Sequence, residues 1–267
     1  MPTVFIFLTA VYAGLGAFAW HCQQQGRGRD YPWKTELPVL GAALTVHGAA
    51  LLMPVIQDKI IIMGFGYSGS LIVWMMLFIY FAGSFFLSAA RSAVAAVSLR
   101  RTDAAVRFGF RKFSGYEITD FPFMLHIGTS LLAYGLFGIA TLLSVLSLLL
   151  HRSLHRRNFS KLAGFLPSLL SLEKLMFQAM WAGFILLTYS VVSGTFFAEA
   201  VFGKPMTFTH KTVFGILSWL IYGGLLLKHS MTAWRGKKAA VWTIIGFVSL
   251  MIAYMGSKFV LEIILKR

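Results

Sequence analysis

Two of the seven histidines in this chain stand where long apolar segments begin, and their positions suit metal chemistry. His126 follows the sequence FPFML, and His210 lies in FTHKTVFGILSW. Two neutral imidazoles that face each other can bind a haem iron from its two sides, as axial ligands do in cytochromes. We therefore expect His126 and His210 to form a haem b site, although they are far apart in the sequence.

The residues around these two histidines suit a large, flat ligand. Lys204 and Lys211 flank His210, and their charges would neutralise the propionates of a haem. Trp219 and six phenylalanines lie within a turn or two of the pair or of the loop before His210: Phe121, Phe123, Phe196, Phe197, Phe208 and Phe214. Aromatic residues near a membrane interface also serve as anchors, and histidines at that depth often have no chemical role. Both interpretations are open from the sequence.

A third histidine, His47, lies inside the apolar segment LTVHGAALL. An ionisable side chain at membrane depth is a candidate functional group, because placing it there is costly. The alternative is a neutral imidazole that bonds to a neighbouring helix. Of the remaining histidines, His229 ends an apolar segment, and three lie beside basic residues, where we expect solvated side chains: His21, His151 and His155.

The sequence lacks the motifs of common catalytic sites. It contains no GxSxG, HExxH or Walker P-loop, and we expect no dinucleotide-binding GxGxxG turn at a helix start. None of the nine acidic residues lies deep within an apolar segment, so a proton-coupled transporter lacks its usual carboxylate. The single cysteine, Cys22, excludes an intramolecular disulfide and a CxxC motif. We therefore expect a protein that is not an enzyme.

The composition is that of an integral membrane protein. The 267 residues are 58% hydrophobic and 12% charged, with a mean hydropathy of +0.75. Soluble domains contain about a quarter charged residues. Lys and Arg outnumber Asp and Glu by 24 to 9. Membrane proteins gather such basic residues in short cytoplasmic loops, so we expect the lipid bilayer as a partner and no nucleic acid.

Seven continuous apolar segments are long enough to cross a bilayer as helices, which needs about 20 residues. Continuous apolar runs favour helices over a transmembrane barrel, whose strands alternate. The first segment has neither a basic start nor a small-residue cleavage site, so we expect it to be retained as a span. The predicted fold is an all-α, polytopic transmembrane helical bundle with spans at 3–20, 37–55, 68–88, 123–150, 172–197, 211–228 and 239–264.

The basic loops predict the orientation of these spans. Basic residues follow the 3–20, 123–150 and 211–228 segments, and if all three loops are cytoplasmic, the N-terminus is external. His126 and His210 then lie at the external face. The chain must also cross the membrane once more between residues 89 and 122, which raises the expected number of spans to eight.

The segment that would make this extra crossing, 89–111, is a weak fourth span. Arg100, Arg101, Asp103 and Arg107 lie near its middle, where charged side chains are costly. Three explanations remain open. The segment is a poor span that neighbouring helices stabilise, an amphipathic surface helix that breaks the count, or the product of a locally altered reading frame.

Three stretches of the second half resemble the CcsA/CcmC/HemX cytochrome c assembly superfamily, nearest to its HemX-like branch. Residues 126–149, HIGTSLLAYGLFGIATLLSVLSLL, are similar to an HxxxSLLSYA-type span of that superfamily. Residues 193–229 and 233–247 (AWRGKKAAVWTIIGF) resemble the stretch that carries its tryptophan-rich external loop and the spans after it. The resemblance is strong over 120–267 and looser over 1–88. We accordingly divide the chain into an N-terminal membrane region, 1–120, and an assembly-like membrane domain, 121–267.

The resemblance implies a bacterial inner-membrane protein that binds or handles haem at its external face during cytochrome c maturation. In that superfamily, external histidines beside the loop are described as haem ligands, and His126 and His210 match them. His47 resembles a span histidine on the haem route. Other cytochrome c maturation proteins are implied as partners.

The chain departs from the superfamily pattern in its external loop. A WGxxWxWD-like sequence is replaced by FFAEAVFGKPMTFTHK, which has no Trp and no Asp. This difference leaves a second interpretation open, a membrane-embedded regulatory or scaffold protein that acts on haem biosynthesis, as HemX-like relatives are thought to do. A small-molecule transporter is a third, although no inverted repeats with broken helices are visible in the sequence.

Overall fold

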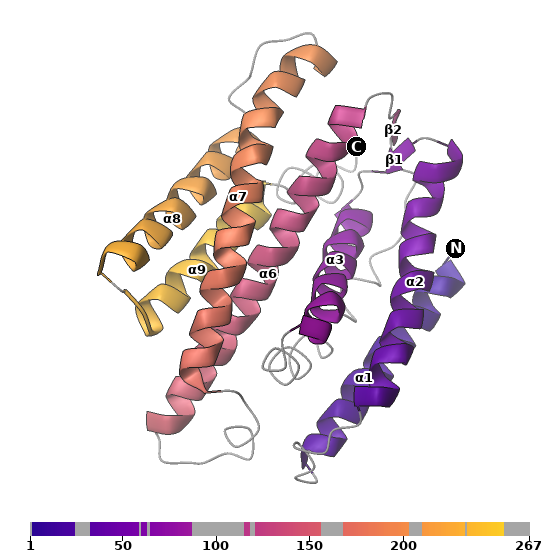
Figure 1. Cartoon of the computed structure of the whole chain (residues 1–267). Coiled ribbons are helices and arrows are strands. Elements are labelled where there is room, and N and C mark those ends of the chain that lie inside the picture. Colours follow the sequence, from indigo (N-terminus) through magenta and orange to yellow (C-terminus); the bar gives the residue numbers. More distant parts are fainter. Residues whose placement is uncertain are drawn as a thin grey trace.

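In the computed structural model the chain forms long helices that run side by side (Figure 1). The structure describes residues 2–24, 33–58, 60–62, 65–86, 115–117, 121–155, 168–202, 210–232 and 234–253. Its helices within these residues are α1 (Pro2–Gln24), α2 (Trp33–Asp58), α3 (Phe65–Phe86), α6 (Phe121–His155), α7 (Leu169–Phe202), α8 (His210–Thr232) and α9 (Lys237–Met251).

Each of the seven predicted apolar segments corresponds to one of these helices, so the helical bundle is confirmed. By length and composition, five helices suit a membrane crossing: Thr35–Met53, Tyr67–Ser84, Met124–Ser153, Leu169–Gly194 and Thr212–Thr232. The apolar stretch of α1, Phe7–Phe18, is shorter, and α9 has 15 residues. The count of eight spans stays a prediction, because the weak fourth, 89–111, lies outside the described residues.

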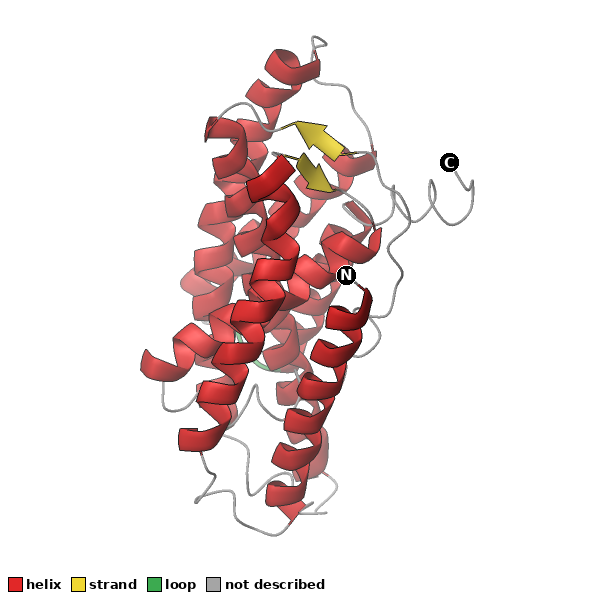
Figure 2. Ribbon diagram, turned by 90° about the vertical axis from the view of Figure 1, so that its right-hand side faces the viewer, coloured by secondary structure: helices red, strands yellow, loops and turns green. Residues whose placement is uncertain are grey.

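A short sheet, not predicted from the sequence, lies toward one end of the helices (Figure 2). Strand β1 (Ile60–Ile62) pairs antiparallel with β2 (Gly115–Glu117), and Ile61 is opposite Tyr116. Three-residue strands are too short for an alternating apolar pattern to reveal. The sheet connects the end of α2 to the start of α6.

The sheet also sets the direction of α3 relative to α6. Both helices begin within a few residues of a strand, α3 after β1 and α6 after β2. The last residue of α3, Phe86, is about 30 Å along the helix from its first, at 1.5 Å per residue. Phe86 and Gly115 therefore lie at opposite ends of α3. An extra crossing between them is what the predicted eight-span count requires.

The first three helices form one packing unit, with α1 against α2 and α2 against α3. A Cβ added at Gly48 of α2 would meet the Trp74 ring of α3 at 2.8 Å, so the glycine allows a close approach. The Trp74 indole N–H donates to the carbonyl of Leu44 at 2.8 Å. Close packing and a hydrogen bond thus hold α2 to α3.

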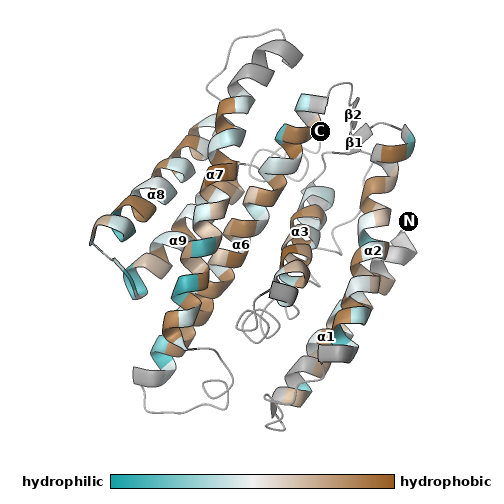
Figure 3. Ribbon diagram, in the orientation of Figure 1, coloured by the Kyte–Doolittle hydropathy of each residue, from teal (hydrophilic) through white to brown (hydrophobic). Residues whose placement is uncertain are grey.

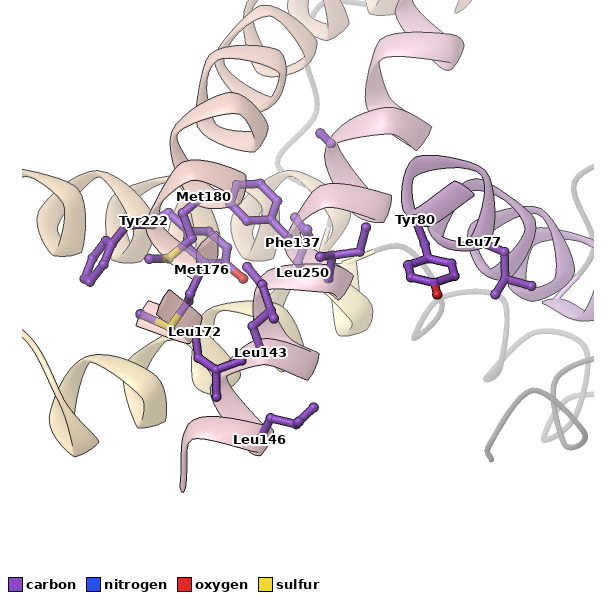
Figure 4. Close-up of a cluster of buried hydrophobic side chains, with 14 of the residues drawn as sticks. Leu77, Tyr80, Phe137, Leu143, Leu146, Leu172, Met176, Met180, Tyr222 and Leu250 are labelled. Carbon is purple, nitrogen blue, oxygen red and sulfur yellow. The ribbon is translucent and has the colours of Figure 1, made fainter. Parts of the chain in front are cut away.

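The last four described helices form a bundle in which α6 and α8 each contact both α7 and α9. Helix α6 also packs against α3 and so joins the bundle to the first unit. Phe137, Met180 and Tyr222 have no exposed surface and lie at the centre of the bundle. Figure 4 shows these side chains among the buried cluster with Leu77, Tyr80, Leu143, Leu146, Leu172, Met176 and Leu250.

The helices are apolar over much of their length, as the brown ribbon segments of Figure 3 show, and many large apolar side chains are exposed. Ile185 on α7 and Leu227 on α8 are 64% and 60% exposed. Exposed apolar surface on this scale indicates a membrane or partner contact. The bundle therefore has the surface that lipid chains require.

The two ends of the bundle differ in charge. We call one the basic end, because the exposed residues Arg152, Lys228, Arg235, Lys237 and Lys238 lie there, and the other the sheet end. The end of α1 and the start of α2 also lie at the basic end, whereas α6 and α8 start at the sheet end (Figure 1). Basic loops on one side of the membrane are what the charge pattern predicts.

Candidate functional site

His126 lies at the sheet end of the bundle, half-buried near the start of α6. Its Nδ1 is 2.7 Å from Oγ of Ser193 on α7. The Ser193 hydroxyl is also 3.3 Å from the carbonyl of Ser190, and when it donates to that carbonyl its oxygen accepts a hydrogen bond from Nδ1–H of His126. In this tautomer, Nε2 carries the lone pair that a metal ion binds.

The register between α6 and α7 produces this contact. The helices run antiparallel, and the residues that meet advance by seven positions on each: Ser130 with Ser190, Phe137 with Gly183, and Ser144 with Met176. A seven-residue repeat keeps one seam of each helix facing the other in left-handed packing. His126 and Ser193 lie one turn beyond Ser130 and Ser190 on the same seam.

Gly194 makes room for the imidazole ring. A Cβ built at this position would lie 3.3 Å from Cε1 and 3.9 Å from Nε2 of His126. A larger residue would therefore press on the ring edge that carries the lone pair. The glycine keeps side chains of α7 away from that edge.

Helix α8 faces α6 across the interior of the bundle. The rings of Phe137 and Tyr222 stack with centroids 3.9 Å apart and planes at 17°. His126 precedes Phe137 by about three turns of α6, and position 210 precedes Tyr222 by slightly more than three turns of α8. Each histidine position therefore lies roughly 17 Å from the stacked rings, toward the sheet end. The two histidine positions thus lie at the same end of the bundle.

The predicted partners of His126 are described only in part. The side chains of His210 and Lys211 lie outside the described residues, as does the whole of Lys204. At about 3.6 residues per turn, position 210 falls on the same side of α8 as Val213 and Leu217, which are 50% and 42% exposed. The pairing of His126 with His210 therefore stays a prediction.

Trp219 lies deeper in the bundle than His126. Its indole N–H donates to Oγ1 of Thr188 at 2.9 Å, and its ring stacks on Phe184 with centroids 5.7 Å apart. Thr188 is about 7 Å from Ser193 along α7. In the described structure Trp219 packs α8 against α7 and is not brought to His126.

His47 lies in a sealed site between the first three helices, with no exposed surface. Its Nδ1 is 3.2 Å from the Tyr12 hydroxyl of α1, and its Nε2 is 2.9 Å from Oγ of Ser70 on α3. Hydroxyl groups on two other helices thus engage both ring nitrogens. This geometry favours the interpretation of His47 as a neutral imidazole that joins helices.

The serines of the α6–α7 seam were not predicted from the sequence. Ser130 Oγ is 2.6 Å from Ser190 Oγ, one turn below the contact between His126 and Ser193. His126 and Ser130 are four residues apart, so the sequence alone indicates that both lie on one face of a helix and could form a polar contact there. The register of α7 against that face was not available from one sequence.

A glycine-rich turn before α3 was also missed. Residues 64–69 are GFGYSG, which fits GxGxxG, and α3 begins within them, so the expectation of no such turn at a helix start is wrong. Dinucleotide sites place this turn between a parallel strand and a helix. Here β1 pairs antiparallel, and Tyr67, Ser68 and Ser70 are buried, so the turn lacks the form of such a site.

The histidine at the basic end has a structural setting. His229 stacks on Phe177 with ring centroids 3.5 Å apart, and its Nδ1 donates to the carbonyl of Trp234 at 3.0 Å. The Lys228 ammonium lies 4.6 Å from the centre of the Trp234 ring. These contacts fasten the connection from α8 to α9.

Among the described residues, no three His, Cys, Asp or Glu side chains gather into a group that could hold a metal ion. A haem iron needs fewer protein ligands, because the porphyrin supplies four nitrogens and the protein one or two axial groups. His126 is the member of the predicted histidine pair whose side chain lies within the described residues.

Known proteins resemble most of this chain. A family model described as "Cytochrome C assembly protein" matches residues 37–265. The "Inner membrane protein YpjD" of Escherichia coli strain K12 is 31% identical over 141 residues, which are 53% of this chain and 52% of that protein. An "Uncharacterized 28.8 kDa protein in nifR3-like 5'region" of Azospirillum brasilense matches with the same figures.

A shorter match links the chain to a third relative. The "Cytochrome c biogenesis protein CcsA" of Prochlorococcus marinus is 33% identical over 88 residues, 33% of this chain and 28% of that protein. The chain thus spans about half the length of the first two relatives and less of the third.

Proposed function

This chain belongs to the cytochrome C assembly protein family, and from that premise we propose that it binds haem b at the sheet end of the α6–α9 bundle. His126 and His210 would hold the haem iron. The observation that carries the proposal is the His126 ring, whose Nδ1 Ser193 holds at 2.7 Å. Histidines that bind metals almost always donate their other ring N–H to an acceptor, which fixes tautomer and orientation.

The described residues fit an imidazole ligand at this position. Ser193 Oγ lies at Nδ1 of His126, and Gly194 accommodates the edge of the ring that carries Cε1 and Nε2. Helices α6 and α8 are diagonal neighbours, since each contacts α7 and α9. Cofactors in helical bundles are held between helices that face each other across the core. When bound here, the haem would be the group that this protein passes on to a cytochrome.

The remaining predicted contacts come from the start of α8 and the segment before it. Lys204 and Lys211 neutralise the propionates, and position 211 is three turns before Tyr222, on the face of α8 that looks toward Phe137. Trp219 supports the site from below by packing α8 on α7. His47 serves the first three helices instead, because a place on the haem route would require one of its hydroxyl partners to leave.

We assign this role to residues 121–267 and place the protein in the bacterial inner membrane, with the basic end in the cytoplasm and the N-terminus outside. The exposed basic residues at one end support this orientation. The E. coli relative is named an inner membrane protein, and the P. marinus relative a cytochrome c biogenesis protein. The protein binds and transfers haem without catalysis, in contact with other maturation proteins.

A second candidate function is a regulatory or scaffold protein that acts on haem biosynthesis and carries no haem. One observation favours it: position 210 shares a side of α8 with the exposed residues Val213 and Leu217. The absence of Trp and Asp from the loop before α8 agrees with it. The two functions differ in whether the purified protein is coloured.

Absorption spectra of the protein from haem-replete cells test the proposal. The wild type should show the sharp Soret and α bands of a bis-histidine haem. His126→Ala should lose most of the haem, and His210→Ala should change it to a five-coordinate, high-spin spectrum. His151→Ala, at the other end of α6, is the matched control and should keep the wild-type spectrum. A colourless wild type would leave only the second candidate.

Reporter fusions test the orientation separately. A fusion after Lys204 should report an external position, and fusions after Arg157 and Lys238 should report the cytoplasm. The reverse pattern would place His126 on the cytoplasmic side and contradict the proposed role in an external maturation step.

A further inference from the structure

The outer face of α7 carries polar groups where a lipid-facing helix carries apolar ones. Gln178 is exposed, and Trp181 and Tyr189 are 46% and 41% exposed. Ile185 and Val192 complete the same side of the helix, and we call these five residues the α7 outer stripe. Teal segments interrupt the apolar ribbon in the lower half of α7 (Figure 3).

Gln178 lies close to the middle of the apolar span of α7. The apolar span of α7 is Leu169–Gly194, and Gln178 is roughly 5 Å from its midpoint at 1.5 Å per residue. The hydrocarbon core is about 30 Å thick, so a lipid-facing carboxamide at this depth meets only acyl chains. An amide without a hydrogen-bond partner in such surroundings is strongly unfavourable.

Exposed hydroxyl groups in the spans can satisfy themselves on their own helix. The Thr45 hydroxyl donates to the carbonyl of Ala42 at 2.8 Å, and the Ser230 hydroxyl to that of Leu227 at 2.8 Å. Within the described part of the chain, the side chain of Gln178 makes no hydrogen bond, nor do the polar groups of Trp181 and Tyr189. The α7 outer stripe therefore presents three unused hydrogen-bonding groups to its surroundings.

The outer side of α8 shows what a lipid-facing surface looks like in this protein. Between residues 213 and 227 its exposed large side chains are all apolar: Val213, Leu217, Leu220 and Leu227. The two helices lie next to each other, so the same bilayer surrounds them. Lipid chains suit the outer side of α8 but leave the polar groups of α7 unpaired.

We propose that the α7 outer stripe docks against the same stripe of a second copy of this chain. A carboxamide both donates and accepts, so Gln178 is complementary to itself across a two-fold axis. Two copies inserted in the same orientation bring their Gln178 side chains to one depth, where each donates to the other. Ala182, exposed and one turn away, is small enough to let the helices approach.

Lys174 is compatible with this pairing. It is exposed on the same side of α7, one turn closer to the basic end than Gln178. Lysine near the end of a span extends its ammonium to the headgroup region. The two like charges then lie in water and lipid phosphate, where their repulsion is screened. This dimer does not depend on the haem proposal.

Disulfide cross-linking in membranes tests the contact directly. Replacing the single native cysteine with Cys22→Ala gives a background for Gln178→Cys, Ile185→Cys and the control Leu220→Cys on α8. Oxidation should convert Gln178→Cys and Ile185→Cys to a species of twice the mass and leave Leu220→Cys monomeric. Equal cross-linking at all three positions, or none at the α7 positions, would overturn the proposal.

A second measurement removes the hydrogen bond and keeps the native cysteine. Gln178→Leu should weaken self-association in liposomes by roughly tenfold, measured by energy transfer between labelled copies, and Gln178→Asn should weaken it less. An unchanged association constant in Gln178→Leu would contradict the proposal. So would cross-linking of Gln178→Cys exclusively to a different protein, because the stripe would then serve another partner.

Discussion

The two described histidines in the spans, His47 and His126, illustrate two uses of the same side chain. His47 has no exposed surface, and hydroxyl groups of α1 and α3 engage both its nitrogens. His126 is half-buried near the start of α6, with Ser193 Oγ 2.7 Å from Nδ1. The first histidine joins three helices, and the second is the one that we propose as a ligand.

This difference shows that membrane depth alone does not identify a functional histidine. Both side chains lie within apolar segments, and by depth His47 is the stronger candidate. The hydrogen-bond partners of His47 weigh against that role, because a ring whose two nitrogens both engage hydroxyl groups has no lone pair to offer a metal. The hydrogen-bond partners of the two ring nitrogens are therefore more informative about a histidine's role than its depth in the membrane.

The largest expected effect concerns the core of the α6–α9 bundle, on which His126 depends for its position. Phe137→Ala removes a ring with no exposed surface that stacks on Tyr222, and the free energy of unfolding should fall by about 3–5 kcal/mol. Thermal unfolding in detergent measures this. The control Leu220→Ala, at a 56% exposed position, should cost less than about 1 kcal/mol. Similar losses in both variants would mean that Phe137 is not part of a packed core.

The next effect separates the two histidines. His47→Leu leaves the Tyr12 and Ser70 hydroxyls without their partner and should lower stability by about 1–3 kcal/mol. The haem content of the folded variant should equal that of the wild type. Unfolding curves and haem analysis of the same sample measure both, with His21→Leu at an exposed position as the control. Loss of haem from folded His47→Leu would place His47 on the haem route and remove the distinction.

The smallest effect concerns the hydrogen bond that orients His126. Ser193→Ala removes the acceptor for Nδ1–H, and haem affinity should fall by about tenfold, as for other partners of metal-binding histidines. Titration of haem into the apoprotein measures it. Ser193→Thr keeps the hydroxyl and should restore affinity, and Ser230→Ala near the basic end should have no effect. An affinity unchanged by Ser193→Ala would mean that the ring needs no such support.

Much of the fold could be predicted from the sequence because continuous apolar runs dominate it. Each of the seven predicted segments overlaps a described helix, and the family model and the match to YpjD confirm the resemblance to cytochrome c assembly proteins. The pairing of β1 with β2 could not be predicted, because strands of three residues carry no period. The orientation of the N-terminus and the eighth span remain predictions.

The site was less predictable, since single-sequence patterns give faces of helices but not their register. His126 was identified from its place at the start of an apolar segment, whereas Ser193 depends on how α7 lies against α6. Trp219 was expected near the haem, but its indole is committed to Thr188 deeper in the bundle. A side chain at the correct helix end is thus not enough to assign it to a site.

The most direct test of the haem proposal is the haem-to-protein ratio of the wild type and His126→Ala, measured as the pyridine haemochrome on samples with matching unfolding transitions. A single haem site that depends on His126 predicts roughly one haem per wild-type chain and close to none in the variant. Equal ratios in the two proteins, or a wild type without haem, would contradict the assignment of His126 as a haem ligand.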